Sequence, residues 1–213
     1  MTETIAVIDF ETNGQPVSYG GRPTEIAAVL VQGGRIVDRY QSLMNAGVYI
    51  PLEIQNLTGI SNAMVRSAPP ARRVMAEVFD FVGDHPLVAH NASFDKCFWD
   101  AELLRQDRQR QQDFACTMLL SRRVFPDSPN HKLGTLVQRF GLPTSGRAHR
   151  ALADAEVTAH LLLHLIAELR RIRQSFNVDP ISHDLLTKLQ RLPKAQLVQG
   201  LARYAPTAPV VQV

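Results

Sequence analysis

Near its start the chain contains the stretch Ile5-Ala6-Val7-Ile8-Asp9-Phe10-Glu11. Its first four residues are apolar and rich in β-branched side chains, which is typical of a central strand buried on both faces. Side chains at i and i+2 of a strand point to the same face, so Asp9 and Glu11 are expected side by side at the strand end. Neighbouring carboxylates repel each other when buried and are a common way to hold a hard divalent cation. The pair alone fits a solvated strand end better.

The rest of the chain predicts a hairpin followed by alternating helices and strands. Strands are expected over 25–31 and 35–43, on either side of the hairpin signal Gly33-Gly34. Two more apolar stretches, 86–90 and 114–116, predict further strands. Helical patterns cover 51–65 as short turns around Gly59, then 69–82, 93–104, 118–124, 133–140 and 151–173, and a last helix starts near Ser182. This order is typical of an α/β fold in which helices pack against a mixed sheet.

Composition bounds the class of protein. The chain has 213 residues, of which 45% are hydrophobic and 20% charged, as in an ordinary soluble domain. No apolar run approaches the roughly 20 residues that a membrane span needs, and no basic segment precedes the first apolar run, so neither a membrane helix nor a signal peptide is expected. Two cysteines, Cys97 and Cys116, lack the spacing of a disulfide framework or a metal site. A reducing cytoplasm is the expected location.

The domain organisation follows from a change of pattern after the long helix. We expect residues 1–174 to form one domain and residues 175–213 to form a C-terminal helical extension with a flexible tail. The break is predicted at Asn177-Val178-Asp179-Pro180, and the flexible part from Ala205. Residues 1–154 hold 16 basic and 16 acidic side chains, whereas residues 155–213 hold 7 basic and 4 acidic ones. This modest basic excess is compatible with nucleic-acid binding without requiring it.

Two further segments place carboxylates next to helices. His90-Asn91-Ala92-Ser93-Phe94-Asp95 follows an apolar run and puts Asp95 one turn into a helix that leaves the sheet. Asn91 or Ser93 is also a candidate cap of that helix, and Asp95 a partner of its dipole. His149-Arg150-Ala151-Leu152-Ala153-Asp154 supplies a fourth carboxylate early in the long helix, just after a histidine that alone would fit a surface position.

Together the segments resemble the three motifs of the DnaQ-like (DEDDh) exonucleases. Residues 7–14, 90–95 and 149–154 have the order and spacing of that family, and Leu57-Thr58-Gly59-Ile60-Ser61 also resembles a family segment. The resemblance covers about residues 4–170. It implies a ribonuclease-H-like fold, which is an α/β mixed five-stranded sheet flanked by helices. It also implies a 3′→5′ exonuclease that releases nucleoside 5′-monophosphates.

The resemblance further implies a two-metal phosphodiesterase site. Its members by analogy are Asp9, Glu11, Asp95 and Asp154, which would hold two Mg²⁺ or Mn²⁺ ions, and His149, which would be the general base for the attacking water. The chemistry agrees, because oxygen ligands suit these ions and two metals can stabilise both the attacking and the leaving oxygen. Histidine titrates in the range useful for water activation.

The same resemblance implies contacts to the terminal nucleotide. The residues expected to make them are Thr12, Leu57, Thr58, Asn91 and Phe94. Members of the family that act in replication often have histidine at the position of Thr58, which affects only fine substrate contacts. Phe10 lies between two ligands, but its side chain should point to the opposite face and pack in the core.

Three functions fit these motifs. The first is a DNA exonuclease, either a polymerase proofreading subunit or a free-standing enzyme; Cys116-Thr117-Met118 with Arg122-Arg123 and Pro126 resembles the exonuclease X type and favours the latter. The second is an RNA exonuclease of the ribonuclease T or oligoribonuclease type, which contacts to the 2′-OH would distinguish. The third is a binding module without chemistry, against which the complete set of carboxylates weighs.

The expected partner is therefore nucleic acid, as a single-stranded or frayed 3′ end, with DNA favoured over RNA. Three roles fit residues 175–213. They could dock a DNA polymerase subunit or a second copy of the chain, they could extend the surface that binds nucleic acid, or they could form a solubilising helix packed on the domain. The first two roles are suggested by the basic residues of this segment, which are Lys188, Arg191, Lys194 and Arg203.

Overall fold

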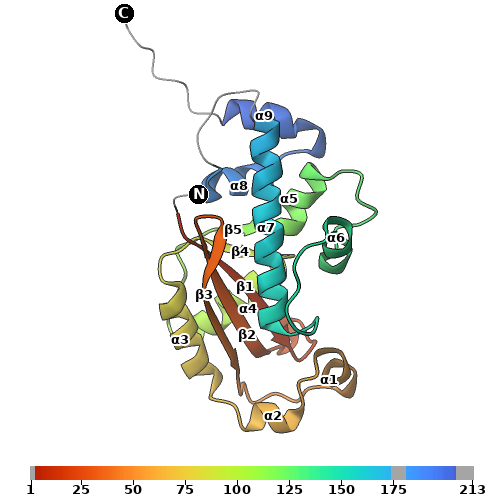
Figure 1. The fold of residues 1–213 in the computed structure, drawn as a ribbon. Helices are drawn as coiled ribbons and strands as arrows, with labels where there is room; N and C mark the ends of the chain where they lie inside the picture. Colours follow the sequence, from red (N-terminus) through yellow and green to blue (C-terminus); the bar gives the residue numbers. More distant parts are fainter. Residues whose placement is uncertain (1–2, 174–180, 205–213) are drawn as a thin grey trace, which may run out of the picture.

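The sheet at the centre of the protein has five strands in the order β3-β2-β1-β4-β5 (Figure 1). The fold is known from a computed structural model that describes residues 3–173 and 181–204. The strands are β1 (Ile5–Thr12), β2 (Pro23–Gln32), β3 (Arg35–Leu43), β4 (Leu87–Ala89) and β5 (Phe114–Cys116). β2 runs antiparallel to β1 and β3, whereas β4 runs parallel to β1 and β5. The predicted mixed five-stranded sheet flanked by helices is confirmed.

Helices cover both faces of this sheet (Figure 1). The helices of the described residues are α1 (Leu52–Thr58), α2 (Asn62–Arg66), α3 (Ala71–Val82), α4 (Ser93–Leu104), α5 (Thr117–Val124), α6 (Leu133–Phe140), α7 (Ala151–Arg173), α8 (His183–Leu189) and α9 (Leu197–Arg203). Side chains of α7 pack with one face of the sheet, and side chains of α3 and α4 pack with the other. The long α7 crosses β1 and β2, so its first turn lies at the end of the sheet where β1 finishes.

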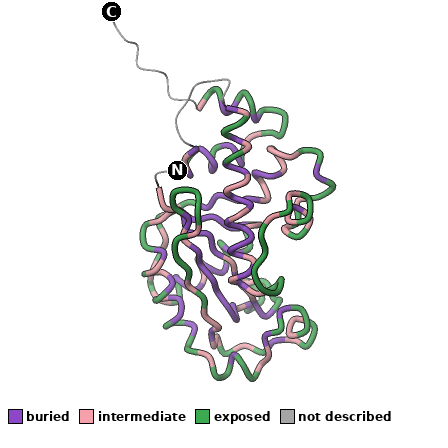
Figure 2. The backbone as a smooth tube through the Cα atoms, viewed as in Figure 1, coloured by how far each residue is buried: buried purple, intermediate pink, exposed green. Residues whose placement is uncertain are grey.

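The apolar run of β1 follows from this two-sided packing. Ile5 and Val7 belong to the cluster with α7, whereas Ala6 and Ile8 belong to the cluster with α3 and α4. Successive side chains of a strand point to opposite faces, so a strand covered on both sides is apolar at every position. Figure 2 shows this core as buried chain running through the sheet and along the inner side of α7. As predicted, Phe10 continues the α4 side, where its ring contacts Phe98 and Trp99.

Some predicted boundaries were wrong. α3 begins at Ala71, not at residue 69, because a residue before proline disfavours the helical conformation and Pro70 follows Pro69. β2 is longer than expected, and α5 begins one residue earlier. The short 3₁₀ turns η1 (Val17–Tyr19) and η3 (Lys194–Gln196), and the helix α9, were not predicted.

The side-chain cap of α4 that Asn91 or Ser93 offered as an alternative is not formed. The helix is preceded by Ala92 as its N-cap residue, and neither Asn91 nor Ser93 caps it with a hydrogen bond. Asn91 instead has a left-handed backbone, with φ of 62°. It therefore turns the chain from β4 into α4, which asparagine tolerates better than most residues.

The segment after residue 180 is built into the same core. Ser182 caps α8 by accepting a hydrogen bond from Leu185 N at 3.2 Å, as its sequence predicted. Leu186 is fully buried in the cluster around α7. Gln190 then pairs with edge strand β5: its amide donates to Phe114 O at 2.9 Å and its carbonyl accepts from Cys116 N at 2.6 Å. The predicted helix break at 177–180 and the tail from residue 205 lie outside the described residues.

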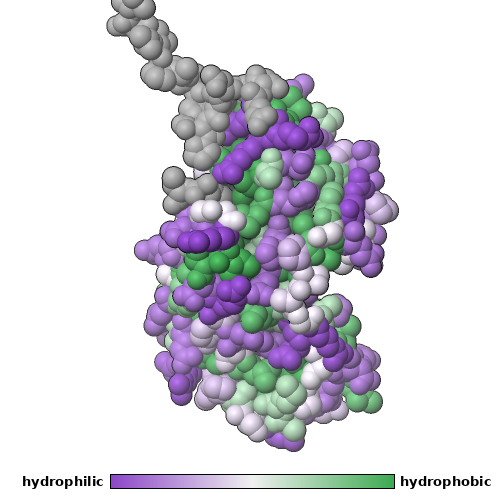
Figure 3. All heavy atoms as spheres, in the orientation of Figure 1, coloured by the Kyte–Doolittle hydropathy of each residue, from purple (hydrophilic) through white to green (hydrophobic). Residues whose placement is uncertain are grey.

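Hydrophobic side chains reach the surface over α1 and α2, at the lower end of the molecule in Figure 3. Those with large exposed fractions are Tyr49, Leu52, Leu57 and Met64. Cys97 is exposed, Cys116 is buried, and both are free thiols. Within residues 3–173 and 181–204, no helix has the length and apolar character needed to cross a membrane.

Candidate active site

A cleft of about 430 Å³ opens where β1 ends, between α1, α4 and the start of α7. Residues from all of the sequence motifs line it: Asp9, Glu11, Thr12, Leu57, Thr58, Asn91, Phe94, His149 and Asp154. The residues predicted for the site therefore come together, and only Asp95 is absent from the lining. Segments as far apart in the sequence as β1 and α7 meet here because α7 packs across the sheet.

Asp95 lies directly behind the cleft. Its side chain is 2% exposed, and its Oδ1 accepts a hydrogen bond from Phe10 N at 3.2 Å. That bond links the first turn of α4 to β1 between Asp9 and Glu11. Burial raises the pKa of both Asp9 and Asp95, and for Asp9 repulsion from Asp95, Glu11 and further carboxylates adds to it.

The other two carboxylates also resist ionisation. Burial and then repulsion from neighbouring carboxylates raise the pKa of Glu11 to about 8, although Arg150 opposes the rise. Burial raises the pKa of Asp154, and a hydrogen bond from His149 N at 3.0 Å opposes it. The site thus gathers more negative charge than its neighbours neutralise. Carboxylate oxygens whose negative charge is not balanced by nearby cationic side chains are suitable ligands for divalent cations such as Mg²⁺ or Mn²⁺.

His149 lines the cleft next to two of these carboxylates. A ring nitrogen of His149 and carboxylate oxygens of Glu11 and Asp154 lie within 4.8 Å of one another, an arrangement that could hold a metal ion. The backbone of His149 is left-handed, with φ of 61°, which is uncommon for a residue other than glycine and is held by the surrounding contacts. The ring therefore faces the carboxylates, as a group that handles a proton there must.

The residues predicted to contact the substrate present different kinds of surface to the cleft. Leu57 and Phe94 are 47% and 41% exposed, so they present apolar surface on two sides of the cleft. The hydroxyl of Thr58 closes the end of α1, donating to Ile54 O at 2.9 Å and accepting from Ile60 N, just beyond the helix, at 3.1 Å. Thr12 is similar, because its hydroxyl accepts from Gly14 N at 3.1 Å. The Thr58 hydroxyl thus both donates and accepts within the wall, whereas the Thr12 hydroxyl only accepts and can still donate.

Sequence reasoning missed Glu25 and His90. Glu25 lies opposite Glu11 in the β1–β2 pairing and is fully buried beside Arg150. His90 lines the cleft and is held by Thr117 Oγ1 at 2.9 Å and His131 O at 3.0 Å. Burial lowers the pKa of His90 to about 4, so its ring is neutral near pH 7. The one signal for Glu25 was a charged residue inside an otherwise apolar strand.

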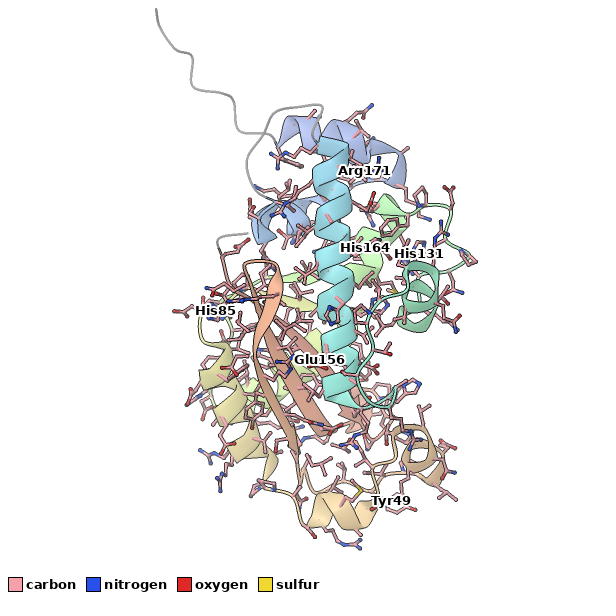
Figure 4. All side chains as sticks on the ribbon, in the orientation of Figure 1. Tyr49, His85, His131, Glu156, His164 and Arg171 are labelled. Atoms are coloured by element: carbon pink, nitrogen blue, oxygen red, sulfur yellow. The ribbon has the colours of Figure 1, made fainter. Side chains whose placement is uncertain are left out.

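A group of cations lies beside the cleft, past His90. Figure 4 shows His131 next to α6, and its carbonyl bonds to the ring of His90. Burial, and then the positive charges of Arg122, Lys194 and Arg139, lower the pKa of His131. Arg122, Arg139 and Lys194 make no ion pair with any described residue. Together with Lys132 they form what we call the cationic surface.

Known proteins resemble this chain in sequence. A family model described as exonuclease matches residues 6–162. The DNA polymerase III subunit epsilon of Aquifex aeolicus is 36% identical over 168 residues, which are 78% of this chain and 82% of that protein. The 3′-5′ exonuclease DinG of Bacillus subtilis is 37% identical over 171 residues, but this chain spans only 18% of its length. For the PolC-type DNA polymerase III of Bacillus cereus, 35% identical, the span is 12%.

Solved structures resemble it in fold. Exonuclease X in complex with 5′ overhanging duplex DNA matches with a TM-score of 0.64 and 30% identity over 76% of this chain and 91% of that one. The nuclease domain of 3′hExo, described as a DEDDh family member bound to rAMP, matches with a TM-score of 0.67 over 78% of this chain and 93% of that one. At 19% identity the second match bears on the fold alone. The predicted ribonuclease-H-like fold is confirmed.

Proposed function

Because the chain belongs to the DnaQ-like 3′→5′ exonuclease family, we propose that it hydrolyses DNA from the 3′ end and releases nucleoside 5′-monophosphates. The observation that carries this proposal is the convergence of Asp9, Glu11, Asp95 and Asp154 at one end of β1, where burial raises the pKa of each and repulsion between carboxylates adds to the rise for Asp9 and Glu11. A binding module would have no use for this unneutralised charge, which lowers the stability of the fold.

In this proposal the four carboxylates hold two Mg²⁺ or Mn²⁺ ions. Bound there, such ions supply Lewis acidity for both the attacking water and the leaving 3′ oxygen. His149 takes the proton from that water as general base, from its position facing Glu11 and Asp154. The roles of these residues agree with their placement, since every ligand is fixed on β1, α4 or α7 and the base on the adjoining loop.

The cleft walls would hold the terminal nucleotide. Leu57 and Phe94 offer exposed apolar surface on which a base or sugar can pack. Phe94 is itself supported by Phe98, with ring centroids 5.0 Å apart. Asn91, Thr12 and Thr58 complete the wall, where the Thr12 hydroxyl and the Asn91 amide can donate to the sugar or phosphate of that nucleotide. Packing of a base on Leu57 and Phe94 tolerates any base, as a non-selective exonuclease requires.

The cationic surface suggests where the rest of the strand lies. Arg122, Lys132, Arg139 and Lys194 would bind phosphates of the strand as it leaves the cleft past His90 and Asn91. One exposed acid, Asp127, lies nearby, and its backbone carbonyl accepts from Arg139. Lys194 comes from η3, so this assigns the C-terminal segment to nucleic acid in preference to a polymerase partner. A cytoplasmic location, expected from the sequence, goes with such a substrate.

DNA is favoured over RNA by the names of the relatives, which include DNA polymerase subunits and a complex with duplex DNA. The deciding experiment compares matched single-stranded DNA, double-stranded DNA and RNA with the purified protein and Mn²⁺. The proposal expects single-stranded DNA to be shortened fastest from its 3′ end. Faster loss of RNA would assign the protein to the exoribonucleases, and no hydrolysis of any strand would remove the enzymatic proposal.

A further inference from the structure

Glu25 is a fifth carboxylate at the site, and the proposed chemistry does not use it. It lies on β2 directly opposite Glu11 and is buried. Burial of a lone carboxylate would raise its pKa, but hydrogen bonds from Arg150, Ala151 and Gln41 outweigh burial and lower the pKa of Glu25. Unlike the four proposed ligands, Glu25 is fully provided with partners within the protein.

Those partners connect Glu25 to the start of α7. Arg150 binds both carboxylate oxygens, with Nε at 3.0 Å and a terminal nitrogen at 2.7 Å. The backbone N–H of Ala151 donates to the same carboxylate at 3.1 Å. The first N–H groups of a helix have no partner inside the helix, and here a side chain of β2 supplies one in place of a local cap. The first residue of α7 is thereby tied to the sheet.

His149 is the residue just before this tie. Its left-handed backbone costs free energy for a residue other than glycine, so neighbouring contacts have to maintain it. On one side Arg147 binds the carbonyls of Asn56 and Leu57, at 2.9 and 3.3 Å. On the other side Arg150 is fixed by two hydrogen bonds to Glu25. The segment with the general base is thus held at both ends, and Glu25 fixes the end nearest the metal ligands.

We propose that the Glu25–Arg150 pair is a positioning device, which keeps the imidazole of His149 directed at the carboxylate group by fixing the chain at the start of α7. Neither residue is assigned to touch the reacting atoms. The inference rests on the proposed role of His149 as general base. A bidentate pair suits the task, because the planar guanidinium fixes orientation as well as distance, which a lysine ammonium does not.

The pair is tested with Arg150→Lys, which keeps the charge and loses the bidentate geometry, and with Glu25→Gln. The probe is thymidine 5′-(p-nitrophenyl phosphate), a substrate too small to use the cationic surface. Misplacement of a catalytic group by about 1 Å can cost about 10²-fold in rate. We therefore expect kcat to fall by about that factor in Arg150→Lys while KM stays within about twofold. If Glu25→Gln does not fold, the kcat of Arg150→Lys alone tests the proposed positioning role.

A double-variant cycle separates positioning from general support of the fold. In the His149→Ala background, Arg150→Lys should cost little further activity, because no imidazole remains to be misplaced. Gln41→Ala is the matched control: it removes a 2.8 Å hydrogen bond that β3, and not α7, gives to the same carboxylate, and kcat should stay at the wild-type value. Losses that multiply in the double variant, or an Arg150→Lys enzyme with normal kcat, would overturn the proposal.

A readout without turnover keeps this inference distinct from the proposed function. Amide hydrogen exchange over residues 149–154 should be faster in Arg150→Lys than in the wild type and unchanged in Gln41→Ala. If the wild type does not hydrolyse the probe, the proposed function fails, and the exchange rates still report on the pair. Unchanged exchange in Arg150→Lys would show that the pair does not fix this segment.

Discussion

Replacing Glu11 by glutamine should stabilise the metal-free protein, although Glu11 is a proposed ligand. The folded state raises the pKa of this carboxyl from 4.5 to about 8. The fold therefore binds a proton that the unfolded chain releases, so this group destabilises the fold increasingly as the pH rises from 4.5 to 8. Below pH 4.5 it is protonated in both states and contributes nothing. Glutamine has the same shape and never ionises, so the variant escapes the whole penalty.

The size of the effect follows from the same pKa. Each pH unit between the two pKa values costs about 1.4 kcal/mol, so at pH 7 the penalty on Glu11 reaches about 3 kcal/mol. For a domain of this size that corresponds to a melting temperature higher by about 6–12 °C. The assay is a thermal melt in EDTA at pH 4 and at pH 7, with Asp84→Asn, at an exposed carboxylate, as control. A Glu11→Gln protein no more stable than wild type at pH 7, or equally stabilised at pH 4, would refute the account of crowded carboxylates.

Other variants test single parts of the site and its surroundings. His149→Ala should lower the rate by about 10²–10⁴-fold and still show the rise in melting temperature on adding Mn²⁺, since the residue is assigned proton transfer and no ligand role; full activity would remove the general base. Lys132→Gln should reduce the salt dependence of binding to a long single strand, by about 0.7 in the slope of log K against log salt. Hydrolysis of thymidine 5′-(p-nitrophenyl phosphate) should not change, and Arg72→Gln, on α3, should alter neither; a Lys132→Gln slope equal to wild type would contradict the cationic surface. Leu186→Ala should destabilise the protein by about 2–5 kcal/mol, because this side chain of α8 is fully buried in the main core; a neutral result would mean that the C-terminal segment is an appendage.

Local patterns were enough to predict the sheet and to single out the four carboxylates, but their assignment to one site came from the family resemblance. The first four positions of β1 are apolar because both faces of the strand are covered there, and that pattern is visible in the sequence. Asp9 and Glu11 are two positions apart on a strand, so their spacing alone predicts that both side chains point to the same face of the sheet. Asp95 and Asp154 were singled out because each closes a motif in the first turn of a helix. Their convergence depended on the family resemblance, since no local pattern reports which helix crosses which strand.

Contacts between distant residues were not predictable in this way. Glu25 and Arg150 are 125 positions apart and meet only because α7 begins beside β2. Gln190 likewise completes the edge of β5 with a side chain, which hydrophobic periodicity cannot indicate. The candidate cap at Asn91 is not formed for a related reason: asparagine can cap a helix or adopt a left-handed turn, and the passage from β4 into α4 requires the turn.

The most direct test of the account is the digestion of a 5′-labelled single-stranded DNA with Mn²⁺ by the wild type and by Asp95→Asn. Asp95 is buried behind the cleft, so its only proposed part in the reaction is to complete the carboxylate set. The account predicts that the wild type shortens the strand from its 3′ end one nucleotide at a time and releases 5′-monophosphates. It predicts that Asp95→Asn melts at the wild-type temperature or above in EDTA and leaves the strand intact. A folded Asp95→Asn protein that digests the strand at the wild-type rate would contradict it.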